Sequence, residues 1–311
     1  MGATLSHSRG DLYYHHSGRF PLSGAVVGLL VGGICAIMLG AAYSYAVLYV
    51  PYPKLSVLLC MGFGAAVGAV TTRVMAKMKV RNWLVMCAVT VAAAAIGVYS
   101  AWLFWVYALL MLWKRPLPLS EFVVNPAHLW RVIKVLNQYG VWKLSKTDKE
   151  AVNGIMLWIV WCGEAALVVG CALALVIPAL AKPFCEECES WCTDKKEIGK
   201  ASATNTAELI RRLEAKDFAY LPPLPAEPPA MTWCSLMLSA CPGCGQTNAL
   251  SVSRITLTKN KKGQVNKTSK SLMNRLVLTP QEAGALVRAC QEGPAAAPIA
   301  EPPASSPLPQ G

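Results

Sequence analysis

The chain has 311 residues, of which 54% are hydrophobic and 15% are charged, and its formal net charge is +12. In a soluble globular protein roughly a quarter of the residues are charged, so this composition excludes an ordinary soluble protein. The deficit lies in the first 180 residues, whereas the chain after Lys182 is ordinarily polar. We therefore expect two environments, lipid first and water second. The positive charge favours contact with anionic lipid or nucleic acid without choosing between them.

Four long apolar stretches follow a polar N-terminal segment, residues 1–21, and predict a transmembrane domain over residues 22–180. Each stretch approaches or exceeds the roughly 20 residues that cross about 30 Å of hydrocarbon as a helix. The first is too long for a secretory signal, whose apolar core has roughly 7–15 residues. The predicted spans are Leu22–Val50, Leu55–Val74, Trp83–Trp113 and Ile155–Leu180.

Aromatic and basic residues predict the topology of these spans. Tyr and Trp prefer the headgroup boundary of a membrane. In this sequence they gather at the ends of the first and third spans and at the start of the fourth. If the spans alternate in direction, these three places lie at the same leaflet. The loop Arg73–Arg81 holds four cations in nine residues and no acid, and short dense loops weigh most in the positive-inside rule. Unpaired thiols in the polar tail favour a reducing compartment. We expect a multi-pass membrane protein with both termini in the cytoplasm.

Small residues within the spans offer a route to helix packing. Gly24, Gly28 and Gly32 recur at every fourth position of the first span, and Gly64 and Gly68 do so in the second. This spacing allows close backbone approach between membrane helices. The alternative is that glycine is simply commoner in membrane helices than in soluble ones. A packed bundle is expected under either interpretation.

Glu164 is an acid well inside the fourth span. An intramembrane carboxylate is costly and normally faces the bundle interior or a water-filled cavity. One hypothesis is a proton or cation site, and the other is a neutral or hydrogen-bonded carboxyl that fixes helix packing. We favour the second hypothesis, because a proton or cation relay needs further ionisable partners and the sequence shows none for Glu164. Four residues lie at about the same depth and are candidate hydrogen-bond partners: Tyr43, Ser44, Tyr99 and Ser100.

The long connection after the third span predicts a basic amphipathic helix over residues 126–139. Asn125 suits its cap, Pro126 its first position and Gly140 its exit. Such a helix lies on the membrane surface, or it caps the ends of the four spans. The sequence leaves both open.

The polar tail, residues 181–292, predicts a small α+β domain. Asn205 with Glu208, and Thr279 with Glu282, have the spacing of helix capping boxes. Residues 293–311 are rich in Pro and Ala and are expected to be disordered. The expected elements are a helix over Thr206–Tyr220, a linker over Pro222–Pro229, strands near Ser251–Thr258 and Leu272–Leu278, and a helix from Thr279 to about Ala289.

Two Cys-x-x-Cys pairs, Cys185/Cys188 and Cys241/Cys244, have the spacing of a tetrahedral thiolate zinc site. The Cys-Pro-Gly-Cys-Gly turn followed by strands resembles a zinc ribbon over about residues 182–278. The resemblance implies that these four cysteines bind one zinc ion and that the long segment between the pairs is an insertion. Cys192 and Cys234 are an extra pair that could replace a ligand, hold a second ion or pack as small hydrophobes.

Other chemistry remains open for the same thiols. Iron–sulfur ligation uses the same residues. A redox dithiol is a third interpretation, although neither pair lies in a thioredoxin-like βαβ setting. The complete fold prediction is an α-helical four-span membrane bundle, a small α+β zinc-ribbon-like domain and a disordered C-terminal tail.

A basic hairpin in the tail suggests a binding surface. The sequence has no acid between Arg254 and Arg275, and such a surface can hold phosphate groups of anionic lipid or nucleic acid. A solvated basic face is the plainer alternative. Its cations are Arg254, Lys259, Lys261, Lys262, Lys267, Lys270 and Arg275.

The sequence favours a non-catalytic function. It shows no nucleophile–base pairing and no phosphate-binding glycine loop, and four thiolates close the shell of a structural metal. Our leading hypothesis is a membrane protein that presents a zinc-stabilised interaction module to a cytoplasmic protein partner. The alternatives are a small ion or solute transporter or channel that uses Glu164, and a membrane-bound thiol oxidoreductase.

Overall fold

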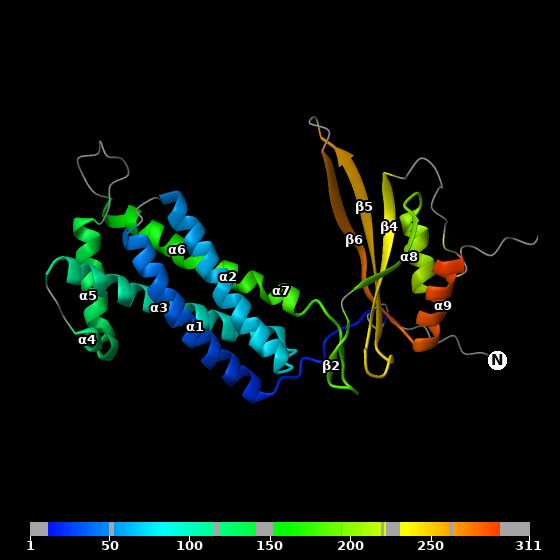
Figure 1. The fold of residues 1–311 in the computed structure, drawn as a ribbon, viewed down its shortest axis with the longest axis horizontal. Helices are drawn as coiled ribbons and strands as arrows, with labels where there is room; N and C mark the ends of the chain where they lie inside the picture. Colours follow the sequence, from blue (N-terminus) through cyan, green and yellow to red (C-terminus); the bar gives the residue numbers. More distant parts are fainter. Residues whose placement is uncertain are drawn as a thin grey trace, which may run out of the picture. The chain divides into compact units, whose positions relative to one another are not determined.

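This computed structural model describes residues 12–49, 53–114, 118–140, 152–193, 195–218, 221, 231–260 and 264–292. The chain divides into two compact units (Figure 1). The helical unit runs from His16 to Ala181. The α+β unit combines the segment before His16 with the chain from Lys182 onwards. The predicted linker Pro222–Pro229 and the predicted disordered tail 293–311 lie outside the described residues.

Four helices of the helical unit are long and apolar enough to cross a membrane. The fourth is broken after Ala174, because Pro178 has no N–H for the carbonyl four residues earlier and its ring crowds that carbonyl. The four-span part of the predicted fold is therefore confirmed. The helices are α1 (Leu22–Tyr49), α2 (Pro53–Lys77), α3 (Trp83–Leu112) and α6 (Gly154–Ala174), which continues as α7 (Val176–Ala179).

Glycines set how closely these helices approach. A Cβ on Gly64 or Gly68 of α2 would overlap the backbone of α6, at Val168 and Ala172 respectively. On α1, a Cβ at Gly32 would overlap the Thr71 side chain of α2. The close-approach interpretation of the glycine spacing is therefore confirmed.

The connection after α3 folds into two helices, α4 (Leu119–Val124) and α5 (Pro126–Tyr139). The bounds of α5 match the prediction, and Gly140 has a left-handed φ of 76° at its exit. Asn125 makes no side-chain capping bond, so that detail of the prediction is wrong. Leu129 and Ile133 pack with α3 and α6, which favours a cap over the ends of the spans rather than a free surface helix.

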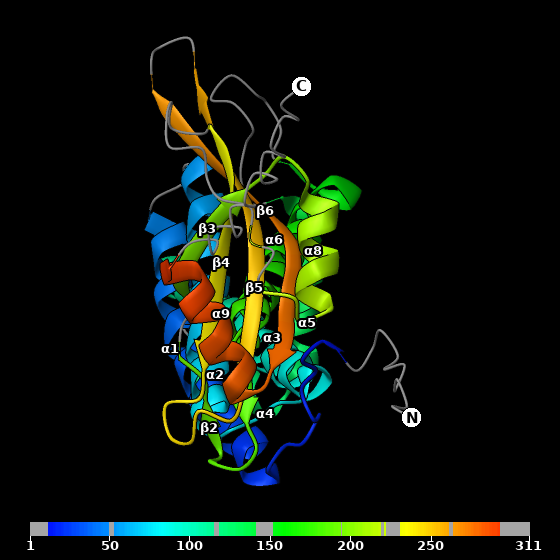
Figure 2. The same cartoon turned by 90° about the vertical axis from the view of Figure 1, so that its right-hand side faces the viewer.

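The α+β unit is built on a four-stranded antiparallel sheet of order β3-β4-β5-β6 (Figure 2). Two helices cover one face of this sheet, and their apolar side chains share its core. The sequence analysis had predicted neither β3 nor β4 as a strand. The elements are β3 (Lys196–Ser202), α8 (Thr206–Glu214), β4 (Thr232–Ala240), β5 (Asn248–Lys259), β6 (Val265–Leu278) and α9 (Pro280–Glu292).

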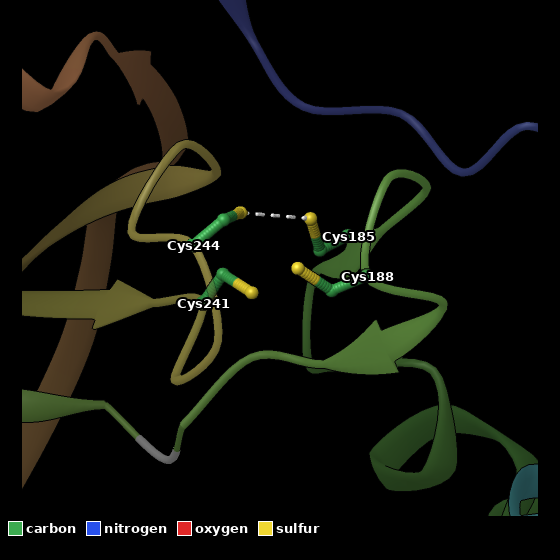
Figure 3. Close-up of side chains that lie close together, drawn as sticks. All are labelled: Cys185, Cys188, Cys241 and Cys244. Atoms are coloured by element: carbon green, nitrogen blue, oxygen red, sulfur yellow. Dashed lines mark hydrogen bonds between the residues drawn. The ribbon is translucent and has the colours of Figure 1, made fainter.

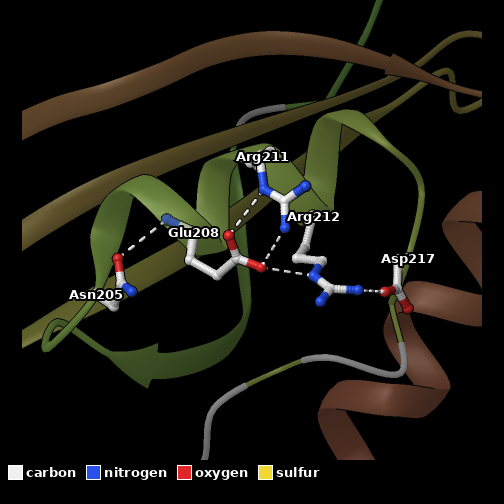
Figure 4. Close-up of polar contacts among 5 residues, drawn as sticks. All are labelled: Asn205, Glu208, Arg211, Arg212 and Asp217. Atoms are coloured by element: carbon white, nitrogen blue, oxygen red, sulfur yellow. Dashed lines mark hydrogen bonds and ion pairs between the residues drawn. The ribbon is translucent and has the colours of Figure 1, made fainter.

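Helix caps fix the ends of α8 and α9. The Asn205 side chain accepts a hydrogen bond from the Glu208 amide at 3.1 Å, as predicted (Figure 4). Thr279 and Glu282 form both bonds of the predicted capping box. Helix α8 ends at Glu214 rather than near residue 220, because Lys216 adopts a left-handed φ of 60°.

The segment before His16 belongs to the sheet. Tyr13 forms an antiparallel bridge with Leu276 of β6, and the Tyr14 amide donates to the Arg275 carbonyl at 2.8 Å. Tyr13 also donates from its hydroxyl to Glu214 at the end of α8. The α+β unit is thus completed by residues that precede the first membrane helix.

The substitution Gly68→Val should destabilise the helical unit by about 1–3 kcal/mol, because the added side chain meets the α6 backbone. Thermal unfolding of the detergent-solubilised full-length protein measures this loss. Gly62→Val is the matched control on the same helix, since a Cβ there meets no atom within 4 Å. Equal effects of the two substitutions would contradict close packing of α2 on α6.

The charge cluster of α8 predicts a pH dependence. Hydrogen bonds from Arg211 and then Arg212 lower the pKa of Glu208 from 4.5 to about 2. A carboxylate with a depressed pKa stabilises the fold above its unfolded pKa, and this stabilisation is lost as the pH falls through its folded value.

We therefore expect Glu208→Gln to speed hydrogen exchange of the α8 peptide at pH 7, and the difference from wild type to shrink as the pH falls from about 4.5 to about 2. Comparing the two proteins at equal pH cancels the other groups that titrate. A difference that does not change over this interval would show that the ion pairs do not stabilise α8.

Candidate metal centre

The first cysteine turn is a small hairpin of two short strands, β1 (Phe184–Cys185) and β2 (Ser190–Trp191). Cys185 pairs with Ser190 across it, so that Cys188 lies in the turn. The Phe184 and Trp191 rings meet edge to face at 5.1 Å and cover the hairpin on one side. The hairpin therefore holds its two thiols at one end of a fixed backbone loop.

The second cysteine turn connects β4 to β5. The Cys241 amide donates to the Thr247 carbonyl at 2.9 Å, and the Gly245 amide donates to the Cys241 carbonyl at 3.1 Å. Gly245 has a φ of +64°, which favours glycine. A Cβ at Gly243 would lie 3.1 Å from the Cys188 sulfur, so this glycine leaves room for the opposite turn.

Backbone bonds bring the two turns together. The Thr193 amide, just after the first turn, donates to the Ala240 carbonyl at 2.9 Å, just before the second. The Ala240 amide donates in return to the Thr193 hydroxyl at 3.2 Å. These bonds lie beside the cysteines and fix the distance between the turns without any metal.

The four paired sulfurs converge on one centre (Figure 3). All four lie within 4.8 Å of one another, and those of Cys185 and Cys244 are 3.6 Å apart. Zinc–sulfur bonds of about 2.3 Å in a tetrahedron place sulfurs about 3.8 Å apart. A disulfide would need about 2.05 Å, and all four cysteines are free thiols. The group has the size and donor set of a metal site.

Backbone amides also point at these sulfurs. The Gln246 amide donates to the Cys244 sulfur at 3.4 Å. Hydrogen bonding from the Cys244 amide is the first cause that lowers the pKa of Cys241, to about 6, and the Gly243 amide acts in the same direction. Burial of the Cys241 sulfur acts in the opposite direction. In contrast, hydrogen bonding with the Cys244 sulfur is the first cause that raises the pKa of Cys188, to about 12. The backbone of the turns therefore favours the thiolate form of Cys241, whereas the closeness of the sulfurs opposes ionisation of all four thiols.

The extra cysteines occupy two different environments. Cys192 is buried beside Cys185 and Cys241 but lies outside the four-sulfur group, and it donates to the Thr247 carbonyl at 3.8 Å. Cys234 lies in the hydrophobic core of the sheet, and burial raises its pKa. Of the three roles considered for this pair, the core position of Cys234 fits packing as a small hydrophobe.

Tyr14 supports the first turn, and the sequence analysis had missed it. Its hydroxyl accepts from the Phe184 amide at 2.9 Å and lies 3.2 Å from the Phe184 carbonyl. The Arg275 guanidinium lies over its ring at 5.9 Å. Burial is the first cause that raises the pKa of Tyr14. The adjacent pair Tyr13-Tyr14, in an otherwise polar segment, was the available signal in the sequence.

Glu164 lies in the middle of α6, away from the cysteines along the chain. The predicted hydrogen-bond partners do not bind its carboxylate. Ser44 donates to the Gly40 and Ala101 carbonyls, both at 2.6 Å, and Tyr99 donates to the Phe122 carbonyl at 3.2 Å. Tyr43 reaches the Cys60 sulfur, and Ser100 donates to the Gly97 carbonyl. The prediction of these partners is therefore wrong.

The basic hairpin is the distal part of β5 and β6. Lys259, Lys267 and Lys270 are exposed, whereas Lys261 and Lys262 lie outside the described residues. Arg254 instead donates to the Thr206 hydroxyl at 2.8 Å, and Arg275 lies against Tyr14. Among the described cations of the hairpin, the three lysines are thus exposed along its outer half, with Lys270 opposite Arg254, and the two arginines have structural contacts.

Comparison with protein-family models, with curated proteins and with solved structures finds no match to this chain.

Substituting Tyr14 by phenylalanine should loosen the first cysteine turn, because it leaves the Phe184 amide without its acceptor. An unsatisfied buried polar group costs about 1–3 kcal/mol. Hydrogen exchange of the peptide that covers residues 183–193 should quicken correspondingly. Tyr45→Phe is the control, because Tyr45 is an exposed residue of α1. Unchanged exchange in Tyr14→Phe would remove Tyr14 from the support of the site.

Proposed function

We propose that this protein is a non-catalytic multi-pass membrane protein whose four helices anchor a zinc-stabilised interaction module at the cytoplasmic face. The convergence of four cysteine sulfurs from two distant turns carries the proposal. Zinc accepts four thiolates in tetrahedral geometry and leaves no open position for a substrate. The metal would hold the fold of the module together rather than perform chemistry.

The donor set favours zinc over the competing chemistries. An iron–sulfur cluster is also bound by four cysteines and is the nearest alternative. A thiol oxidoreductase needs one pair of cysteines that cycles between dithiol and disulfide, and a contact of 3.6 Å between the Cys185 and Cys244 thiols is compatible with that. The convergence of four sulfurs rather than two is what favours a metal. The amide donors around the sulfurs suit a bound thiolate in either metal site.

A metal at this position would stabilise the module in a definite way. It would join a hairpin before β3 to the turn between β4 and β5, and so close a long loop of the chain. Closing a long loop restricts the unfolded chain, and metal binding to the folded state alone adds to stability. The ion would thus fix one end of the sheet.

The partner surface is the exposed end of the β5–β6 hairpin. Lys259, Lys267 and Lys270 give it positive charge, and Val265 is an exposed apolar side chain among them. We propose an acidic protein surface as its partner, with anionic lipid or nucleic acid as the alternatives. Such a surface attracts a partner of opposite charge and fixes its register.

Purified full-length protein should contain one zinc ion per chain by elemental analysis. Replacing any of Cys185, Cys188, Cys241 or Cys244 by serine should abolish stoichiometric zinc and lower the unfolding temperature. Cys192→Ala is the matched control and should retain the ion, because its sulfur lies outside the group. Stoichiometric iron with sulfide would establish the cluster instead, and a metal-free protein with a reversible disulfide would establish the oxidoreductase.

A photo-crosslinking residue at Val265 should capture the partner in native membranes. The same residue at Gln281, exposed on α9, is the control position. We expect protein adducts from position 265 that high salt suppresses, because Coulomb attraction between exposed charges is screened. Lipid or nucleic-acid adducts would replace the protein partner by that class. No adduct specific to position 265 would contradict the interaction surface.

A further inference from the structure

A cavity of about 110 Å³ lies inside the helical unit, between α1, α2, α3 and α6. Glu164 lines this cavity near the middle of α6. Ten residues separate it from the start of that helix, a rise of about 15 Å, so it lies deep within the span. An apolar cavity of about 150 Å³ takes up benzene, so this space is on the scale of a small ligand.

Aromatic rings form much of the cavity wall. Trp102 meets Trp105 and Trp161 at centroid distances of 5.5 and 4.8 Å, and both interplanar angles are 86°. The Trp102 ring is therefore nearly perpendicular to each of the other two indoles. Tyr43 and Phe63 stack at 5.4 Å and add a further wall. Ring faces carry negative electrostatic potential, so such walls attract a cation.

The carboxylate in this cavity has no cationic partner among the described side chains. The ion pairs within the described ranges leave Glu164 out. Two nearby donors are already used, because Tyr43 reaches the Cys60 sulfur at 3.8 Å and Cys60 reaches the Glu164 backbone carbonyl at 3.4 Å. The Glu164 carboxyl therefore lines the cavity without a cation, and its ionised form would supply the negative charge that a cationic ligand neutralises.

We propose that this cavity binds a small organic ammonium ion, with Glu164 as the counter-ion and the Trp102, Trp105 and Trp161 rings as its aromatic cage. A quaternary or methylated ammonium is recognised by aromatic faces and by one carboxylate. Its methyl groups suit the apolar walls, whereas a bare inorganic cation needs several oxygen ligands. The cavity offers one carboxylate and few further oxygens.

This site is independent of the metal module, because every residue that lines it belongs to the helical unit. Binding also requires no transport. Its failure would leave the proposed interaction module unaffected, and loss of zinc would leave the cavity residues in place.

Choline chloride is the probe, and 3,3-dimethyl-1-butanol is its neutral isostere. Isothermal titration calorimetry of the full-length protein in detergent, supported by tryptophan fluorescence, measures both. We expect saturable binding of choline, and binding of the isostere that is weaker by about tenfold or more. Sodium chloride at equal ionic strength should not compete.

Glu164→Gln should weaken choline binding by about tenfold or more and leave the isostere nearly unchanged. Trp105→Leu keeps apolar bulk but removes a ring face, and it should weaken choline several-fold. Glu121→Gln is the matched control, since Glu121 pairs with His128 on α5 and lies outside the cavity. Unfolding temperatures identify any variant that fails to fold.

Three results would overturn the proposal. They are the absence of saturable choline binding to folded wild-type protein, equal binding of the neutral isostere, and unchanged choline affinity in folded Glu164→Gln. Competition by sodium at equal ionic strength would assign the site to an inorganic cation and would equally overturn it.

Discussion

Four sulfurs held within 4.8 Å of one another impose the strongest constraint on this molecule. Four thiolates at that spacing would repel one another, and the burial of Cys185 and Cys241 removes water that would screen them. The backbone nevertheless fixes them there, through the Thr193–Ala240 bonds and the tight turn at Gly245. A divalent cation bound there would relieve this repulsion. The rest of the α+β unit follows from this junction, since β4 and β5 extend directly from one of its turns.

The sequence predicted those features whose chemistry is local. Span lengths follow from the thickness of the hydrocarbon, and the caps at Asn205 and Thr279 follow from side chains three residues from their donors. The Cys-x-x-Cys spacing is likewise local, and it predicts a pair of metal ligands in one turn. Proximity of the two pairs across a long intervening segment did not follow from spacing, because it depends on the register of β4 with β3.

The sequence did not predict features that depend on the direction in which a side chain points from its helix, or on which strands pair with each other. Counting depth placed Tyr99 and Ser100 level with Glu164, but depth does not say which way a side chain points. Ser44 and Ser100 bond carbonyls of their own helix, as hydroxyls in helices commonly do. Strand β3 has a largely exposed pattern without clear alternation, and its place in the sheet comes from pairing with β4.

The bridge between Tyr13 and Leu276 has a consequence for how the chain is threaded. A backbone bridge cannot form through hydrocarbon, so the residues before α1 and the strand β6 must share one aqueous compartment. A polypeptide that enters and leaves a bilayer from the same compartment crosses it an even number of times. The four helices, identified by length and hydropathy, satisfy this parity. The requirement for an even number itself depends on neither hydropathy nor charge. An odd number of crossings would part Tyr13 from its strand.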